Sequence, residues 1–361
     1  KRQLQIVADA ATELPEGVEN EDGTVTYTYT LRDGLVWSDG QPVTAGDFAF
    51  AWQRAASPEL AADYGYMFEV VDGYADIWAT DDDGNFLNPD AQLNVVALDD
   101  KTLQVTTANY VAYWNELLAF PTYFPVHQAS VEAADPDGTN PGAWALEAGF
   151  VSNGAYTLTK WEHNSSMTYE KNPNYHRADE VTIEKQEFML SSDENATFAA
   201  YNAGNLDFSD GIPTAEIAGV KESSEFYVVD TLGVTYVSFN VTSDLFDGMT
   251  AAEANTFRRA LALLVDRDYI VTSITQTGQV PADSFIPYGC LDGNGEEFKN
   301  TSYYSADPAD FEANVEEGIA MLESIGYKFD GGVLSAETPI NFEYIVHTVS
   351  YTHLTLPTNS L

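Results

Sequence analysis

The sequence predicts an α/β protein built of two or more lobes, and three observations support that prediction. The chain of 361 residues is longer than one hydrophobic core usually supports. Stretches with the alternation of strands and stretches with helical spacing follow one another without a fixed period, which favours an α/β fold over a repeat array. Hydrophobic residues make up 44% of the chain, which is enough to fill buried cores and is not typical of disorder.

The charge balance excludes two classes of partner. The chain has 57 acidic and 15 basic residues, for a formal net charge of −42. A surface of this kind repels phosphate backbones and anionic lipid headgroups, so we expect neither nucleic-acid binding nor direct membrane adsorption. The acidic residues are spread along the chain, which is typical of a strongly solvated surface. A preference for basic ligands is the alternative.

Nothing in the sequence predicts a metal, a cofactor or an active site. Cys290 is the single cysteine, so neither an intrachain disulfide nor a thiolate zinc cluster can form. No HExxH, CxxC, GxSxG or glycine-rich phosphate motif occurs, and such motifs mark the common metal, nucleophile and nucleotide sites. The aspartates of 81–89 are spaced as in a calcium loop, but the bidentate glutamate of that loop is missing. We therefore expect a protein that is not an enzyme.

The clearest local pattern is a strand region followed by a capped helix. In residues 24–37, β-branched and aromatic residues alternate with other residues, as is typical of strands, and Asp33 begins a turn within this stretch. Thr44 is the expected N-cap, with Asp47 in the first turn of a helix over 45–56. One face of that helix is apolar, with Phe48, Trp52 and Ala55 at helical spacing.

The same two periodicities predict the remaining elements. Strands are expected at 93–98, 101–107, 156–161, 166–171, 181–190, 206–209, 226–230 and 234–241. Helices are expected at 109–118, 195–203, 251–265 and 311–325. The apolar faces of the last two consist of Ala254, Phe257, Leu261, Leu264 and Val265, and of Phe311, Val315, Ile319, Leu322 and Ile325. Two prolines in 120–126 predict an extended crossover between lobes.

Three blocks of sequence resemble the extracellular solute-binding family 5, the peptide, dipeptide and nickel binding proteins of ABC importers. They are LRDGLVWSDGQPVTAGDFAFAWQRA, then NGAYTLTKW with YEKNPNYH, then FRRALALLVDRDYIV. They occur in the family's order, and the resemblance spans about Thr24 to Tyr327. His176 stands where the family more usually has a tryptophan. The run Trp52-Gln53-Arg54 and its spacing to Tyr64 are most similar to the oligopeptide branch.

The resemblance implies a periplasmic-binding-protein type II fold, with two lobes joined by a hinge and an additional domain. We expect this chain to hold the fold incompletely, since it begins at Lys1 without an initiating Met. Residues 349–358, VSYTHLTLPT, resemble the translation of a sequencing-library adapter; a genuine Thr-rich strand is the alternative. We expect a remnant of the first lobe at 1–23, the additional domain at 24–126 and part of the first lobe at 127–232. The N-terminal part of the second lobe is expected at 233–348 and a non-native tail at 349–361.

The resemblance also implies a function. The protein is then expected to be the extracytoplasmic substrate-binding component of an ABC importer, which captures oligopeptides in an inter-lobe cleft and delivers them to permease subunits. The intact protein, of which this chain is expected to be a part, is then a monomer in the periplasm, or a lipoprotein on the outer face of the cell membrane. Alternatives within the family are a dipeptide, a nickel complex or a sugar oligomer as ligand. A peptide-sensing receptor and a secreted hydrolase are alternatives from other classes.

Five residues match or lie near cleft positions of the family. Tyr64 and Tyr236 match ligand-facing aromatics, Gly233 and Val234 offer backbone groups, and Asp210 lies where the family's cleft is polar. Each has a structural alternative. The tyrosines can be half-buried packing residues, and Asp210-Gly211 can be an ordinary turn.

Overall fold

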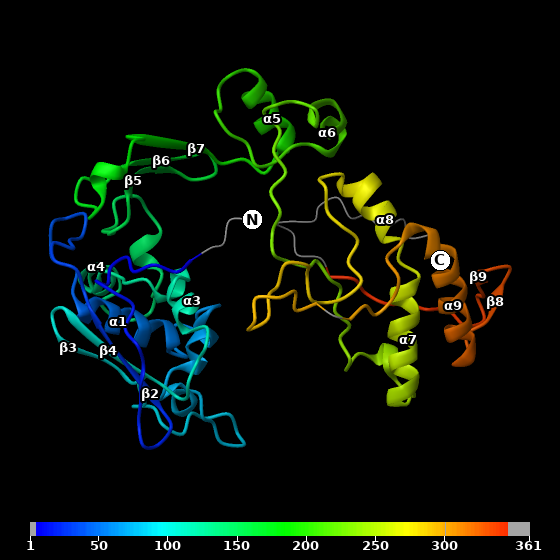
Figure 1. Ribbon diagram of the computed structural model, residues 1–361, viewed down its shortest axis with the longest axis horizontal. Coiled ribbons are helices and arrows are strands. Elements are labelled where there is room, and N and C mark those ends of the chain that lie inside the picture. Colours follow the sequence, from blue (N-terminus) through cyan, green and yellow to red (C-terminus); the bar gives the residue numbers. More distant parts are fainter. Residues whose placement is uncertain (1–4, 300, 346–361) are drawn as a thin grey trace. The chain divides into compact units, whose positions relative to one another are not determined.

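A computed structural model describes residues 5–299 and 301–345 and confirms the α/β class (Figure 1). The chain divides into two compact units, Lys1–Ser192 and Asp193–Leu361. The first unit contains two antiparallel sheets, and the second is mainly helical. The domain boundaries expected at 126 and 232 stay predictions.

The strands of the first unit form two sheets. They are β1 (Val18–Glu19), β2 (Val25–Thr30), β3 (Val95–Asp99), β4 (Thr102–Thr107), β5 (Tyr156–Glu162), β6 (Ser166–Lys171) and β7 (Lys185–Met189). One sheet has the order β1-β2-β4-β3 and the other the order β5-β6-β7. In β2 the alternation is that of the sequence, since Val25, Tyr27 and Tyr29 are buried while Thr28 and Thr30 are exposed.

Helix α1 (Ala45–Ala56) covers the core of the first sheet and begins where the sequence predicts. The Thr44 backbone N–H donates to Asp47 Oδ2 at 2.8 Å, and the Thr44 hydroxyl donates to the same oxygen at 3.0 Å. This arrangement satisfies groups that a helix start otherwise leaves unpaired. The predicted apolar face is confirmed, because Phe48 and Trp52 are buried and Ala55 packs against the same core.

The other helices of the first unit are short. They are α2 (Tyr74–Ile77), α3 (Trp114–Leu118) and α4 (Gln128–Ala134), with 3₁₀ turns at Gly65–Val70, Pro121–Tyr123, Ala143–Ala145 and Ala178–Glu180. The helix expected over 109–118 begins only at Trp114. The reason is local: the Thr107 hydroxyl donates to the Asn109 carbonyl at 2.7 Å, so the chain turns there.

The segment 120–126 does not run extended, so that prediction is wrong for its centre. Pro121–Tyr123 is a 3₁₀ turn, and Tyr123 is buried in the core of the first unit. The Trp52 indole N–H donates to the Tyr123 carbonyl at 2.8 Å, and the Tyr123 hydroxyl donates to the Met67 carbonyl at 2.6 Å. Because a buried hydroxyl and indole need partners, these bonds select the turn over an extended chain.

The second unit is centred on a helix pair. Its helices are α5 (Glu194–Asn202), α6 (Thr214–Val220), α7 (Ala251–Leu263), α8 (Arg267–Tyr269), followed by a π-helical turn (Ile270–Thr275), and α9 (Phe311–Ser324). It also has 3₁₀ turns at Asp244–Phe246 and Pro308–Asp310 and a small hairpin of β8 (Phe329–Asp330) and β9 (Val333–Leu334).

Helices α7 and α9 pack closely. The core between them contains Phe257, Ala260 and Leu322. A Cβ at Gly318 would lie 3.0 Å from the Ala260 carbonyl oxygen, so a side chain there would push the helices apart. The sequence predicted Phe257 and Leu322 correctly but also put Val265 on this face, and Val265 is 42% exposed because α7 ends at Leu263.

Three predicted strands of the second unit are wrong. Among the described residues no strand forms at 206–209, 226–230 or 234–241 (Figure 1). Tyr227 and Val229 are 79% and 81% exposed, and Val228 between them is 55% exposed, so the side chains on both faces of this segment are mostly exposed. A β-branched and aromatic composition indicates that residues fit a pleated, half-buried surface, but a strand also requires a neighbour that takes its peptide hydrogen bonds.

Within the described part of the chain, no helix has the length and apolarity that crossing a membrane requires. The tail at 349–361 lies outside the described residues, so its adapter origin stays a prediction.

Candidate functional site

In the first unit, Tyr64 belongs to a solvent-facing group of aromatic rings. It follows α1 and precedes the 3₁₀ turn Gly65–Val70, and its side chain is 49% exposed. Its ring centroid lies 5.0 Å from that of Phe120 and 6.2 Å from that of Tyr66. We call Tyr64, Tyr66 and Phe120 the first-unit cluster. It presents aromatic surface that the core of this unit does not use.

The turn that carries Tyr64 is held tightly against α1. A Cβ at Gly65 would lie 2.8 Å from the Ala55 carbonyl oxygen, so only glycine permits this approach. The Met67 N–H donates to the Tyr64 carbonyl at 3.1 Å. The backbone of Tyr64 is therefore fixed while its ring faces solvent.

In the second unit, Tyr236 packs on Phe285. The two ring centroids lie 4.9 Å apart at an interplanar angle of 64°, which is a favourable edge-to-face geometry. Tyr236 is 60% and Phe285 57% exposed. We call these two residues the aromatic pair.

The loop that contains Phe285 runs beside the extended chain that contains Tyr236. A Cβ at Gly278 would lie 3.2 Å from Val228 Cγ1, and a Cβ at Gly289 would lie 3.5 Å from Leu232 Cδ1. Both glycines have a positive φ, +88° and +97°, which favours glycine. These contacts and the aromatic pair bring 278–289 against 228–236.

Gly233 and Val234 lie on this extended chain. The Gly233 N–H is already used, since it donates to the Thr231 carbonyl at 3.0 Å. Within the described residues no hydrogen bond engages the N–H or the C=O of Val234, which is half-buried. No described atom lies within 4 Å of a Cβ built at Gly233. A ligand backbone therefore has an open approach at Gly233 and a peptide group to pair with at Val234.

Asp210 lies apart in the chain, in a bend between α5 and α6. Its side chain is exposed. The neighbouring Ser209 hydroxyl donates to the Gly211 carbonyl at 2.9 Å, which stabilises the bend. The strand expected to precede it is absent, so the structural alternative of a turn fits its geometry.

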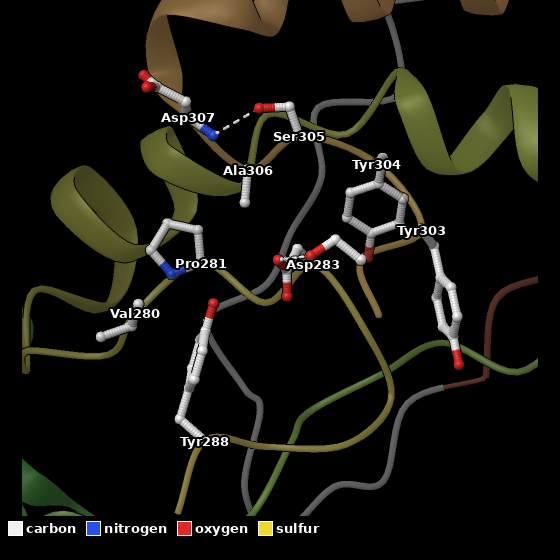
Figure 2. A pocket seen from close by; sticks show the side chains of 10 residues that line it. Val280, Pro281, Asp283, Tyr288, Tyr303, Tyr304, Ser305, Ala306 and Asp307 are labelled. Atoms are coloured by element: carbon white, nitrogen blue, oxygen red, sulfur yellow. Dashed lines mark hydrogen bonds between the residues drawn. The ribbon is translucent and has the colours of Figure 1, made fainter. Parts of the chain in front are cut away.

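A pocket of about 590 Å³ in the second unit has a charged wall. In the view of Figure 2, Asp283 is drawn between the ring of Tyr288 and the rings of Tyr303 and Tyr304. Asp283 Oδ1 lies 2.8 Å from Lys299 Nζ, and its other oxygen accepts a hydrogen bond from Ser302. Asp307 at the rim accepts from the Ala309 N–H at 2.9 Å. Both acidic groups of the pocket thus have partners within the protein.

Within the described residues no group of three or more His, Cys, Asp or Glu side chains is arranged to hold a metal ion. The aspartate-rich loop at 81–89 has an internal use for its first carboxylate. Asp81 Oδ1 accepts from the backbone N–H groups of Asp83 and Asn85, at 3.0 and 2.8 Å. This is the geometry of an Asx turn, and it needs no cation.

Comparison with known proteins identifies the family. The family described as bacterial extracellular solute-binding proteins, family 5 Middle, matches residues 5–355. The chain belongs to this family. Oligopeptide-binding protein OppA of Bacillus subtilis is 32% identical over 289 residues, which cover 78% of this chain and 50% of that protein. Dipeptide-binding protein DppE of the same organism is 32% identical over 277 residues, which cover 76% of this chain and 47% of that protein. The chain spans about half the length of these relatives.

Solved structures of family members confirm the type of fold. The structure of Haemophilus influenzae OppA in complex with RPPGFSPFR superposes with a TM-score of 0.69 and 31% identity, over 88% of this chain and 58% of that one. Relatives of this chain are solute-binding proteins and not enzymes. The periplasmic-binding-protein type II class predicted from the sequence is thereby confirmed.

The sequence did not indicate three of the residues that form the first-unit cluster and the aromatic pair. Only the contact with Tyr236, which lies 49 positions away in the chain, indicates Phe285 as a candidate site residue. Tyr66 and Phe120 likewise join Tyr64 through the fold. The available signal was an aromatic residue in a proline-containing loop, as in Ser284-Phe285-Ile286-Pro287. Binding residues are more often found in such surface loops than in the hydrophobic core.

Proposed function

We propose that this chain is the ligand-capturing part of an oligopeptide importer and that Tyr236 with Phe285 contacts the bound peptide. The observation that carries the proposal is the exposed aromatic pair, whose Tyr236 lies two residues along the chain from the unengaged N–H and C=O of Val234. An extended peptide can hydrogen-bond to such a backbone whatever its sequence, while its side chains pack on rings. The relatives named for oligopeptide and dipeptide binding support this ligand class.

The remaining predicted contacts fit the same function. Tyr64, in the first-unit cluster, offers an exposed ring on a fixed backbone, and Gly233 permits close approach of the ligand. Asp210 is a solvated carboxylate that a ligand cation can reach through water. The protein captures and releases peptide without chemical change.

The family supports a proposal for the membrane partner and the location of this protein. Extracellular solute-binding proteins work outside the cytoplasmic membrane. We propose that this protein acts there as a monomer, anchored by a lipid or free in the periplasm, and delivers peptide to the permease subunits of an ABC importer. The net charge of −42 keeps such a protein soluble and away from anionic lipid.

Fluorine NMR tests the ligand class directly. The chain is labelled with 3-fluorotyrosine, resonances are assigned with single Tyr→Phe variants, and the nonapeptide RPPGFSPFR is added. We expect saturable shifts at Tyr236 and Tyr64 and none at Tyr269, which is 57% exposed on α8. Tyr236→Ala is expected to weaken binding about tenfold, which corresponds to about 1.4 kcal/mol, and Tyr269→Ala to leave it unchanged.

Two outcomes would contradict this assignment. A folded chain whose tyrosine resonances do not respond to millimolar peptide would not be a peptide binder. Shifts produced by a dipeptide, a nickel complex or a sugar oligomer, but not by the nonapeptide, would assign the ligand to one of those classes.

Gly233→Ala separates ligand contact from stability. Because a Cβ at this position meets no described atom within 4 Å, we expect the free energy of unfolding to stay unchanged or to rise by up to about 1 kcal/mol. We expect peptide affinity to fall severalfold, since the methyl group obstructs the ligand backbone. The matched control is Gly219→Ala in α6, where a Cβ also meets nothing. Equal peptide affinities for both variants would remove Gly233 from the site.

A further inference from the structure

The ion pair of Lys299 and Asp283 differs from the solvated ion pairs of this chain. The two side chains are only 7% and 14% exposed, and Nζ lies 2.8 Å from Oδ1. Lys328 and Glu337, also in the second unit, pair at 2.6 Å while 62% and 69% exposed. Lysine and aspartate are rarely buried without a partner, and a buried pair is stabilising only when its geometry is good.

Both partners stay charged around neutral pH. Burial by itself raises the pKa of Asp283, but the ion pair with Lys299 and the hydrogen bond from Ser302 outweigh burial and hold that pKa below its ordinary value. The ion pair with Asp283 raises the pKa of Lys299. Around neutral pH the ion pair therefore connects the loop that begins at Asp283 with the segment that contains Lys299.

Lys299 also fixes an aromatic ring. Its Nζ lies 4.2 Å from the centroid of Tyr288, within the range of a cation–π interaction. Tyr288 and Asp283 both line the pocket of Figure 2. One ammonium group thus holds both ends of the loop 283–288.

Further hydrogen bonds fasten the same loop. The Tyr303 N–H donates to the Asp283 carbonyl at 2.8 Å, and the Gly289 N–H donates to Glu297 Oε1 at 2.8 Å. Within the loop, Ser284 is buried and its hydroxyl donates to the Ile286 carbonyl at 3.0 Å. Phe285 lies between those two residues, and its ring remains exposed against Tyr236.

We propose that the Lys299–Asp283 ion pair is a positioning element for ligand recognition: it fixes the loop 283–288 so that Phe285 presents its ring to Tyr236 and to the bound ligand. This inference rests on the proposed function as far as the ligand is concerned. The positioning itself concerns only the second unit. Lys299 and Asp283 act through Phe285 and do not contact the ligand.

The ring of Tyr236 reports this positioning without any ligand. A 3-fluorotyrosine at 236 senses the ring of Phe285 at 4.9 Å, so Phe285→Ala defines the shift that complete loss of the contact produces. We expect the double variant Asp283→Leu with Lys299→Met to move the Tyr236 resonance by at least half of that shift. Removing both charges together avoids an unpaired buried charge, so the variant is expected to fold.

Two further variants separate positioning from general packing. Lys299→Arg keeps a cation that can pair with Asp283 and lie over Tyr288, so we expect it to retain the Tyr236 resonance. Lys328→Met removes the exposed pair with Glu337 and is expected to leave the resonance unchanged. In the double variant, peptide affinity is expected to fall by the factor found for Phe285→Ala.

The outcomes of the two readouts are independent. A Tyr236 resonance that does not move in the folded double variant, while Phe285→Ala moves it, would overturn the positioning role. A moved resonance with peptide affinity equal to that of the unsubstituted chain would overturn the role in recognition. If neither the unsubstituted chain nor any variant responds to peptide, the proposed function fails. The shift of the Tyr236 resonance in the absence of ligand still decides whether the ion pair positions Phe285.

Discussion

Trp52→Ala is expected to lower the free energy of unfolding of the first unit by about 3–5 kcal/mol, the range for deleting a large buried aromatic. Trp52 is 2% exposed. Its ring makes edge-on contacts with Tyr123 at 5.2 Å and Trp114 at 6.3 Å, and a tilted one with Phe68 at 6.0 Å. Deletion leaves a cavity among these rings, and the surroundings cannot close it because they are held by the sheet and by α1.

The substitution also removes a hydrogen bond. The Trp52 indole N–H donates to the Tyr123 carbonyl, and an unsatisfied buried acceptor costs about 1–3 kcal/mol. Trp52→Phe keeps most of the ring volume but loses this bond, so we expect a smaller loss of stability than for Trp52→Ala. Urea denaturation followed by circular dichroism measures both variants.

The matched control is Tyr110→Ala, an aromatic deletion in the same unit at a side chain that is 74% exposed. We expect it to change the free energy of unfolding by less than about 0.5 kcal/mol. A loss for Trp52→Ala no larger than that of this control would show that the ring cluster is not the core of the first unit.

Much of the first unit could be predicted from the sequence because its elements are specified locally. The helix at Ala45–Ala56 carries its own cap in Thr44 and Asp47, and β2 carries its inward residues at every second position. Such signals need no knowledge of distant residues. Where a distant contact decides the structure, as with Trp52 and the Tyr123 carbonyl, the prediction of an extended crossover was wrong.

The second unit shows more clearly what a local sequence pattern cannot predict. Its helices α5, α7 and α9 have local periodicity and were predicted, whereas the short helices α6 and α8 were not. The chain at 226–241 has strand composition without strand pairing among the described residues. Pairing is a property of two segments, and composition describes only one of them.

The candidate site divides in the same way. Tyr64 and Tyr236 were indicated by resemblance, and both have exposed rings. Phe285 could be found only from the fold, and so could the Lys299–Asp283 pair, whose members lie 16 positions apart in irregular chain. A charged pair in a loop has no periodic sequence signal, since its spacing is set by the path of the loop and not by a helix or strand repeat.

Phe257→Ala is expected to lower the free energy of unfolding of the second unit by about 3–5 kcal/mol. Phe257 is fully buried and is the largest side chain in the core between α7 and α9. Its ring meets Phe246 edge-on at 6.0 Å and lies 5.7 Å from Tyr327. The close helix approach at Gly318 depends on this core, so the cavity is expected to loosen both helices.

Phe285→Ala is the control that separates folding from recognition in this unit. It deletes the same side chain at a position that is 57% exposed, so we expect less than about 1 kcal/mol of destabilisation. We expect the reverse order for peptide affinity when it is measured on folded protein: Phe285→Ala weakens binding, because its ring packs on Tyr236 at the proposed site, while Phe257→Ala in its folded fraction binds as before. Equal destabilisation by the two variants would make Phe285 a core residue and would remove the aromatic pair from the site, because a ring that holds the fold together is not available to a ligand.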